Sequence, residues 1–358
     1  MITIIYSFRN REIDRVRKSL NSLCLQTNKN FNVIFIDYGS QIKTAQEVKN
    51  TVESFSFCTH YYVYAEFQIW NKSKALNFAI KKVTSDYCFI ADVDMIFHPN
   101  FIEILNEKKV VNIATYFQVG FLSKEESLKE VPFEEYKINF LTDENATGMT
   151  LFPVEKLHLI NGFDEFFHFW GAEDTDIHNR LKNVGCDIVY NDSKLLLLHQ
   201  WHKNFRSRET KKISQELQLR GIVELNNNHM WFNFRNKVSQ INKEGWGEVI
   251  KPSDFEELKG IDPQILSREK SKINHFLYNE LPNSKEKVLA VKIKKGKIDR
   301  LEIKYLLKKI LRRKVAERYT LREINDLFLI HIISFYNYFP YSYQISDDLE
   351  NITFKIKK

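Results

Sequence analysis

The feature that most constrains the fold is a regular alternation of short apolar runs with helix-periodic segments along the first hundred residues. Each apolar run ends in polar or turn-forming residues, and between the runs apolar side chains recur every three or four positions. The expected strands are Thr3–Ser7, Phe31–Ile36, Thr59–Tyr64 and Tyr87–Ala91, with helices over 13–24, 41–55 and 74–83. This order predicts an α/β fold in which a mostly parallel central sheet is flanked by helices.

Polar side chains follow the expected strands at the points where the strands end. Arg9 and Arg11 follow the first strand, Asp37 follows the second, and Asp92 and Asp94 follow the fourth. The carboxyl ends of parallel strands meet at one edge of the sheet, where ligands of such folds bind. The sequence therefore predicts a functional site at this edge.

The pair Asp92 and Asp94 has the spacing of two oxygen ligands. Alternate residues of an extended segment share a face, so both carboxylates are able to point the same way. Carboxylate oxygens suit a hard divalent cation such as Mg²⁺ or Mn²⁺. On its own, an Asp-x-Asp pair is also a common way to end a strand.

An aromatic and acidic segment in the second half of the chain is more specific. Trp170-Gly171 precede Glu173, Asp174 and Asp176 at an expected helix start. The helix dipole favours acids in a first turn, but this does not account for the Trp-Gly pair before them. An exposed indole beside carboxylates is suited to a sugar, because the ring stacks on it and the acids accept hydrogen bonds from its hydroxyls. A carboxylate at this place is also a candidate general base.

Two histidines, His199 and His202, follow the expected buried strand Leu195–Leu198. A single histidine after a strand is more often structural than a ligand. Two of them, together with a separate acidic pair, favour metal coordination.

Taken together, these motifs resemble those of the GT-A-fold glycosyltransferases, in particular the β-1,4-galactosyltransferase type and the bacterial chondroitin-polymerase-like family 2 enzymes. They occur in the family's order over residues 1–202, and Ala172 stands where the family has a glycine. The segments that carry the resemblance are Phe8-Arg9-Asn10-Arg11, Asn71-Lys72-Ser73-Lys74-Ala75-Leu76-Asn77, Asp92-Val93-Asp94 and Trp170-Gly171-Ala172-Glu173-Asp174-Thr175-Asp176.

The resemblance implies a role for each matching residue. Asp174 is implied as the general base. The implied acceptor contacts are Trp170, Gly171, Glu173 and Asp176. The implied nucleotide-sugar contacts are Phe8, Arg9, Arg11, Asp37, Lys74, Asp92 and Val93. The implied metal ligands are Asp94, with Asp92 nearby, and His199, His202 or both.

The function implied by the resemblance is metal-dependent, inverting glycosyl transfer. The donor is a UDP-sugar held with Mn²⁺ or Mg²⁺, and galactose or N-acetylgalactosamine is favoured among hexoses and N-acetylhexosamines. The acceptor is a hydroxyl of a saccharide or lipid-linked glycan, the product is a β-glycoside, and the setting is bacterial surface polysaccharide or glycan synthesis. The alternative is a catalytically silent glycan-binding or scaffolding protein of the same fold, which would be expected to lose Asp94 or Asp174.

The excess of basic over acidic residues lies entirely at the end of the chain. Ile261–Lys358 hold 21 Lys and Arg against 12 Asp and Glu, whereas Met1–Gly260 hold 32 against 34. We therefore expect a catalytic domain over 1–260 and a smaller, basic α+β or helical extension over 261–358. Within the extension, 303–314 has apolar residues at helical spacing between cations. That pattern predicts either an interfacial helix on an anionic membrane or a helix packed on its own domain. No nucleic-acid-binding motif is present, so no nucleic-acid partner is expected.

Three further expectations concern the structure of residues 203–225, the redox compartment and the cellular location of the protein. The basic stretch 203–212 is expected either to close over the donor as a loop or to begin a solvated helix, and Arg208–Leu225 have the pattern of a helix. Four scattered cysteines without a CxxC pair are typical of a reducing compartment. The longest apolar stretch is too short to span a membrane, which predicts a cytoplasmic protein, peripheral at most.

Overall fold

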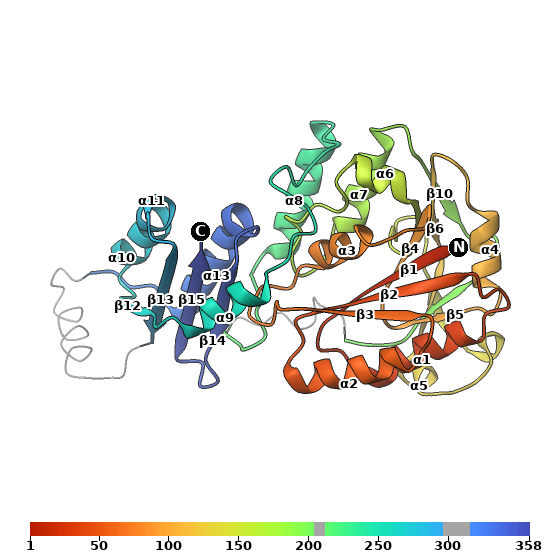
Figure 1. Cartoon of the computed structure of the whole chain (residues 1–358), viewed down its shortest axis with the longest axis horizontal. Helices are drawn as coiled ribbons and strands as arrows, with labels where there is room; N and C mark the ends of the chain where they lie inside the picture. The colour runs from red at the N-terminus through yellow and green to blue at the C-terminus, as the bar shows by residue number, and fades with distance from the viewer. Residues whose placement is uncertain (204–211, 296–315) are drawn as a thin grey trace. The chain divides into compact units, whose positions relative to one another are not determined.

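The computed structural model describes residues 1–203, 212–295 and 316–358, which form two compact units (Figure 1). Unit 1 comprises residues 1–66, 70–203 and 222–249. Unit 2 comprises residues 67–69, 212–221 and the described residues from 250 onward. Residue 260, where the sequence analysis placed a domain boundary, is the last residue of α9 (Pro252–Gly260) and lies inside unit 2.

The centre of unit 1 is a seven-stranded sheet with the order β10-β6-β9-β4-β1-β2-β3 among the described residues. β9 pairs antiparallel with both of its neighbours, and the other pairs are parallel. The strands are β1 (Ile2–Phe8), β2 (Phe31–Tyr38), β3 (Cys58–Val63), β4 (Tyr87–Ala91), β6 (Ile113–Phe117), β9 (Thr150–Pro153) and β10 (Asp187–Asn191). The predicted mostly parallel sheet is confirmed.

Helices cover both faces of this sheet (Figure 1). On β1, Ile4 and Tyr6 face a core formed with α1 (Ile13–Cys24), α2 (Ile42–Glu53) and α4 (Phe101–Glu107). Ile5 faces the opposite core, which is formed with α3 (Lys72–Ile80), α6 (Val154–Leu159) and α7 (Glu173–Lys182). Apolar residues on both faces explain why the strands appear in the sequence as nearly continuous apolar runs.

A second sheet of unit 1 has four strands among the described residues. Its order is β5-β11-β7-β8, and β11 lies between an antiparallel β5 and a parallel β7. The strands are β5 (Met95–Phe97), β7 (Val119–Leu122), β8 (Ile138–Leu141) and β11 (Leu197–His199). The remaining helices of this unit are α5 (Lys124–Ser127), the 3₁₀ turn η1 (Phe133–Glu135) and α8 (Ile222–Arg235).

Unit 2 is a smaller α+β body. Its sheet has the order β12-β13-β15-β14 among the described residues. Helix α13 begins with a capping box between Thr320 and Glu323. The elements besides α9 are β12 (Gln264–Leu266), α10 (Lys270–His275), η3 (Phe276–Glu280), α11 (Leu281–Asn283), β13 (Val288–Lys294), α13 (Leu321–His331), η4 (Ile332–Tyr336), β14 (Tyr341–Ile345) and β15 (Asn351–Lys357).

The expected helix over Arg208–Leu225 is wrong over residues 212–221 and correct only over 222–225. Residues 212–221 are not helical, and α8 begins at Ile222, directly after Gly221 with a φ of 71°. A glycine with a positive φ interrupts a helix, and the polar pattern before it did not reveal the break. The basic helix expected over 303–314 and all but the ends of the stretch 203–212 lie outside the described residues. No helix within the described residues is long and apolar enough to cross a membrane.

Candidate active site

The ends of β1 and β2 form a tight polar corner. The Arg9 side chain donates to the Glu66 carbonyl at 2.5 Å. Asn10 and Ser40 tie the two strand ends together, because the Asn10 backbone N–H donates to the Ser40 hydroxyl and the Asn10 side chain accepts from the N–H of Gln41. The corner holds Arg9 at the sheet edge where the sequence analysis placed it.

Asp37 is fully buried in this corner. One of its carboxylate oxygens accepts the Ser40 N–H at 2.9 Å, and the other has no hydrogen-bond partner among the described residues. Burial raises the pKa of Asp37 to about 6, against the opposing effects of Ser40 and the Arg9 charge. Gly39 has a φ of 76°, and a side chain on it would meet the Ala65 carbonyl carbon at 2.3 Å, so only glycine fits this turn.

Asp94, His199 and His202 converge just beyond β4 and β11. Nε2 of His199 lies 3.5 Å from one Asp94 oxygen, and Nε2 of His202 lies 3.2 Å from the other. One ligand atom from each residue falls within 4.8 Å of the others. We call these three residues the metal cluster.

The fold explains how these three distant residues meet. Pairing of β11 with β5 sets His199 beside Met95, one residue after Asp94, and pairing with β7 sets it beside Phe121. The imidazole of His199 stacks on the Phe121 ring at 4.4 Å. The Asp94 carbonyl accepts the N–H of Gln200, which fixes the chain between the two histidines.

The metal cluster fits a divalent cation such as Mn²⁺. Burial alone would raise the pKa of Asp94, but the charges of both histidines and a hydrogen bond from His202 bring it well below its usual range. The carboxylate is therefore ionised, and its buried Oδ1 has no hydrogen-bond partner among the described residues. One carboxylate and two imidazoles form a donor set that first-row divalent metals accept.

A second cluster surrounds Lys72, the first residue of α3. Its ammonium lies 3.3 Å from Asp92, 3.6 Å from Glu173 and 3.8 Å from Asp174. Thus one lysine gathers a carboxylate from the end of β4 and two from the start of α7. We call these four residues the lysine cluster.

Charge and burial oppose each other in the lysine cluster. Burial alone would lower the pKa of Lys72, but the carboxylates of Asp174, Asp92 and Glu173 raise it well above its usual value. Burial raises the pKa of Asp174 to about 7, with Lys72 acting in the opposite direction and Glu173 and Asp92 adding to the rise. Asp174 is thus a carboxyl group that changes protonation near neutral pH.

The approach to α7 is irregular. Phe169, Gly171 and Ala172 have φ values of 62°, 101° and 72°, and the side chain of Ala172 does not cap the helix. Trp170 lies among them with 45% of its surface exposed. The predicted acceptor residues Trp170 and Gly171 therefore lie just before Glu173, the predicted acceptor residue that belongs to the lysine cluster.

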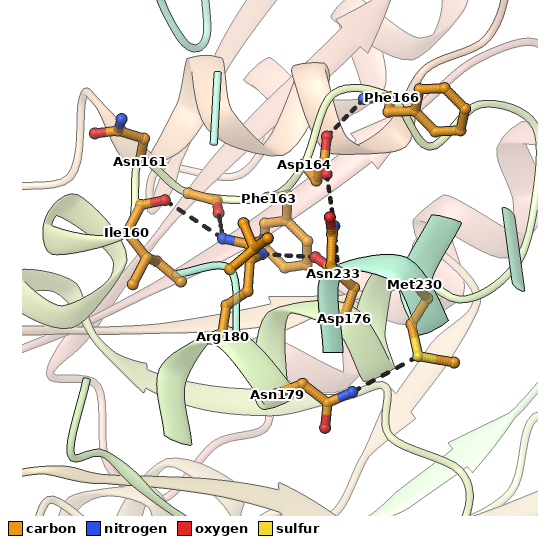
Figure 2. Close-up of polar contacts among 12 residues, drawn as sticks. Ile160, Asn161, Phe163, Asp164, Phe166, Asp176, Asn179, Arg180, Met230 and Asn233 are labelled. Atoms are coloured by element: carbon orange, nitrogen blue, oxygen red, sulfur yellow. Dashed lines mark hydrogen bonds and ion pairs between the residues drawn. The ribbon is translucent and has the colours of Figure 1, made fainter. Parts of the chain in front are cut away.

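Asp176, which was predicted to contact the acceptor, is enclosed within the protein instead. It is only 1% exposed, and its two oxygens accept from Arg180 at 2.6 Å and from Asn233 at 2.9 Å (Figure 2). A carboxylate so enclosed does not face a ligand. It joins α7 to α8 instead.

Lys74 is likewise turned inward. It is 5% exposed, and its ammonium lies 3.3 Å from Glu165. Glu165 also accepts from the side chain of Asn77 and from the N–H of Gly247. The cation of this motif that faces the site is Lys72, which the sequence analysis did not select.

The other predicted nucleotide contacts differ in exposure. Phe8 and Val93 are both buried in the apolar core, at 1% and 7% exposure. Arg11 is exposed, and its charge lowers the pKa of Asp94 after the larger effects of the two histidines. The structure thus brings Arg11 toward the metal cluster.

Two family models match the chain. Residues 3–147 match the model of glycosyl transferase family 2, and residues 130–200 match the model of the N-terminal domain of galactosyltransferase. The first match covers the strand ends with Arg9, Asp37, Asp92 and Asp94, and the second covers Asp174 and His199. The resemblance to family 2 and galactosyltransferase-type enzymes is confirmed, and glycosyl transfer is the activity that both models indicate.

The solved structures similar to this chain are distant. TarS 1–349 of S. aureus in complex with UDP is 15% identical with a TM-score of 0.43, over 56% of this chain and 60% of that one. The mannosyltransferase PcManGT of Pyrobaculum calidifontis, in complex with GDP-Man and Mn²⁺, is 17% identical with a TM-score of 0.42, over 57% and 58%. GalNAc-T7 with UDP, GalNAc and Mn²⁺ is 12% identical with a TM-score of 0.45, over 56% and 44%. The chain thus spans less than two thirds of these proteins, and no curated protein matches it in sequence.

Proposed function

We propose that this glycosyltransferase moves a hexose or N-acetylhexosamine from a UDP-sugar to a saccharide hydroxyl with inversion, giving a β-glycoside. Galactose and N-acetylgalactosamine are the favoured sugars. The observation that carries the proposal is the pair of clusters at one sheet edge. The metal cluster offers ligands for a cation that binds a diphosphate, and the lysine cluster offers a carboxylate whose pKa lies near neutrality.

In the proposed reaction, Asp174 acts on the acceptor. The acceptor hydroxyl oxygen attacks the anomeric carbon, the bond from that carbon to the UDP oxygen breaks, and UDP leaves with the electron pair. The hydroxyl proton passes to an oxygen of Asp174. Burial raises the pKa of Asp174 to about 7, and this value suits a base that must be ionised before the reaction and protonated after it.

The donor is proposed to lie between the metal cluster and the polar corner of β1 and β2. Arg9, Arg11 and Asp37 would hold the uridine and its phosphates. Asp94, His199 and His202 would hold Mn²⁺ or Mg²⁺, with Asp92 nearby. When bound, the cation supplies positive charge opposite the diphosphate of the leaving group. Arg11 adds further positive charge at this place.

The acceptor is proposed to stack on Trp170. The exposed indole offers an apolar face, and the neighbouring carboxylate of Glu173 accepts hydrogen bonds from sugar hydroxyls. Lys72 lies 3.6 Å from Glu173 and 3.8 Å from Asp174, so it keeps these two like charges close together. The acceptor is a saccharide or lipid-linked glycan, in keeping with synthesis of a bacterial surface polysaccharide.

The basic extension is proposed to bring the enzyme to an anionic membrane surface in the cytoplasm. Residues 296–315 hold eight Lys and Arg against two Asp and Glu. Basic clusters of this size bind anionic headgroups. Sedimentation with vesicles of phosphatidylglycerol and phosphatidylcholine tests this: binding that is absent from pure phosphatidylcholine supports the proposal, and equal binding to both contradicts it.

The proposed reaction is tested by nucleotide release across a panel of UDP-sugars with GDP-mannose as the control donor. Because these reactions free the nucleotide even when water is the acceptor, no acceptor needs to be known. We expect Mn²⁺-dependent UDP release that EDTA abolishes and that Asp94→Asn lowers by roughly 100-fold, since the metal loses its ionised ligand. Release that persists in EDTA contradicts the metal site. Release from no donor, together with binding of a glycan, favours the catalytically silent protein instead.

A further inference from the structure

A buried polar network connects Asp176 and Arg180 of α7 with Asn233 of α8 (Figure 2). Asp176 and Arg180, four residues apart on α7, are each 1% exposed and form an ion pair at 2.6 Å. The Arg180 guanidinium also donates to the carbonyls of Ile160 at 3.3 Å and Gly162 at 2.9 Å. These contacts fasten the middle of α7 to the segment that follows α6.

Helix α8 completes the network from the other side. The amide of Asn233 donates to Asp176 at 2.9 Å and to Asp164 at 3.1 Å. Asp164 in turn accepts from His229, also on α8, and from the N–H of Phe166. Asn233 is 4% exposed, so a single side-chain amide bridges two buried carboxylates.

The start of α7 lacks the usual means of holding a helix end. Its N-cap residue is Ala172, which provides no capping side chain and adopts a left-handed φ of 72°. Phe169 also has a positive φ, a conformation that costs a non-glycine residue about 1 kcal/mol or more. Such an approach persists only where the surroundings determine it. The network reaches this first turn at Asp176, two residues from Asp174.

We propose that Asn233 and Arg180 are positioning residues, which hold the first turn of α7 so that Asp174 reaches the acceptor hydroxyl. Neither residue contacts the lysine cluster directly. They act through Asp176, on the same helix as Asp174 and Glu173. The inference rests on the proposed function, because Asp174 is the group being positioned. It assigns a catalytic consequence to α8, which carries no predicted site residue.

The physical reason is that a general base works only within hydrogen-bond reach of its proton. A displacement of the order of 1 Å costs roughly 100-fold in rate. Loss of Asn233 leaves the carboxylates of Asp164 and Asp176 buried with one partner fewer, so the helix relaxes until water satisfies them. The metal cluster lies just beyond β4 and β11 and makes no contact with this network among the described residues, so nucleotide binding is expected to be unaffected.

The test compares Asn233→Leu with Asn236→Leu, a substitution of the same kind at an exposed position directly after the same helix. We expect Asn233→Leu to lower kcat for transfer to acceptor at least tenfold, with donor KM and Mn²⁺-dependent UDP affinity within twofold of the wild type. The rate of UDP release with water as the acceptor should fall less than the rate of transfer to a saccharide acceptor. Asn236→Leu should match the wild type in every measurement.

A purely structural role predicts a different pattern. Partial unfolding would lower transfer, UDP release and the number of UDP-binding sites by the same factor, and that result overturns the proposal. So does transfer by Asn233→Leu within twofold of the wild type. Arg180→Lys is the second variant. Lysine keeps the positive charge beside Asp176, but it lacks the planar guanidinium that also donates to the carbonyls of Ile160 and Gly162. We therefore expect kcat for transfer to fall while UDP affinity stays near the wild-type value.

Amide hydrogen exchange separates this inference from the proposed function. Exchange at residues 173–178 should be at least tenfold faster in Asn233→Leu than in Asn236→Leu, whether or not a donor has been identified. If wild-type protein turns over no UDP-sugar, the proposed function fails while this difference in exchange persists. If exchange is the same in both variants, the network does not position α7 and the inference fails by itself.

Discussion

The two clusters at the sheet edge have opposite charge balances. In the metal cluster one carboxylate, Asp94, faces two imidazoles at 3.2 and 3.5 Å. In the lysine cluster three carboxylates face one ammonium at 3.3 to 3.8 Å. Both clusters combine burial with a charged partner, yet the pKa of Asp94 is lowered and the pKa of Asp174 is raised.

The difference shows how one edge provides two kinds of carboxylate. Protonated histidines overcome burial and lower the pKa of Asp94, so that acid stays ionised, and both imidazoles give up their extra protons when they bind a cation. Around Asp174, burial and the neighbouring acids outweigh Lys72 and raise the pKa to about 7. Two carboxyl groups of one type thereby differ in pKa, as the proposed roles of metal ligand and general base require.

The largest expected effect comes from Asp174→Asn. An amide cannot take a proton from the acceptor, so transfer should fall roughly 1,000-fold. UDP affinity with Mn²⁺ should not change, because the metal cluster is intact. Initial rates with acceptor and calorimetric UDP titrations measure the two effects, and Asp187→Asn, at an exposed position on β10, is the matched control. Wild-type transfer by Asp174→Asn would assign the base to another residue.

A smaller effect is expected when Lys72 is removed. With the pKa of Asp174 at about 7, the base is protonated below that pH and kcat/KM should fall about tenfold per pH unit there. Lys72 lowers this pKa, so Lys72→Met should move the acid limb of the profile to higher pH. Lys72→Arg keeps the charge and should leave the limb near its wild-type position. A limb that stays in place, or that moves to lower pH, in Lys72→Met contradicts the assigned coupling.

The strand ends were predictable because their signals are local. A short apolar run followed by Arg9, Asp37 or Asp94 marks the carboxyl end of a strand, and parallel topology then brings these ends to one edge. The histidines were found for the same reason, since β11 ends at His199.

Lys72 was missed because the start of α3 was placed at Lys74. The structure begins the helix at Lys72, with Asn71 as the N-cap that accepts the N–H of Lys74. That start places Asn71, Lys74 and Asn77 on the side that contacts 163–168, and leaves Lys72 to face the acids. A capping asparagine three residues before a lysine was the available signal.

The network around Asn233 could not be found by periodicity. Helix analysis assigns apolar residues to the buried face, whereas α8 turns Asn226 and Asn233 inward. Their partners are buried acids and backbone carbonyls from segments 56 to 69 residues away in the chain. Only the tertiary fold brings such groups together, since no local pattern distinguishes a buried amide from an exposed one.

The smallest expected effect concerns backbone strain, which is present beside the lysine cluster and absent from the residues of the metal cluster. None of Asp94, His199 and His202 has a positive φ, whereas Ala172 before the lysine cluster has a φ of 72°. Ala172→Gly should therefore stabilise the protein by about 0.5–1 kcal/mol, measured by urea unfolding. Gly171→Ala should destabilise it by about as much or more, although its new methyl group meets no atom within 4 Å. Equal stability of both variants would show that the approach to α7 relaxes freely and that no strain is held there.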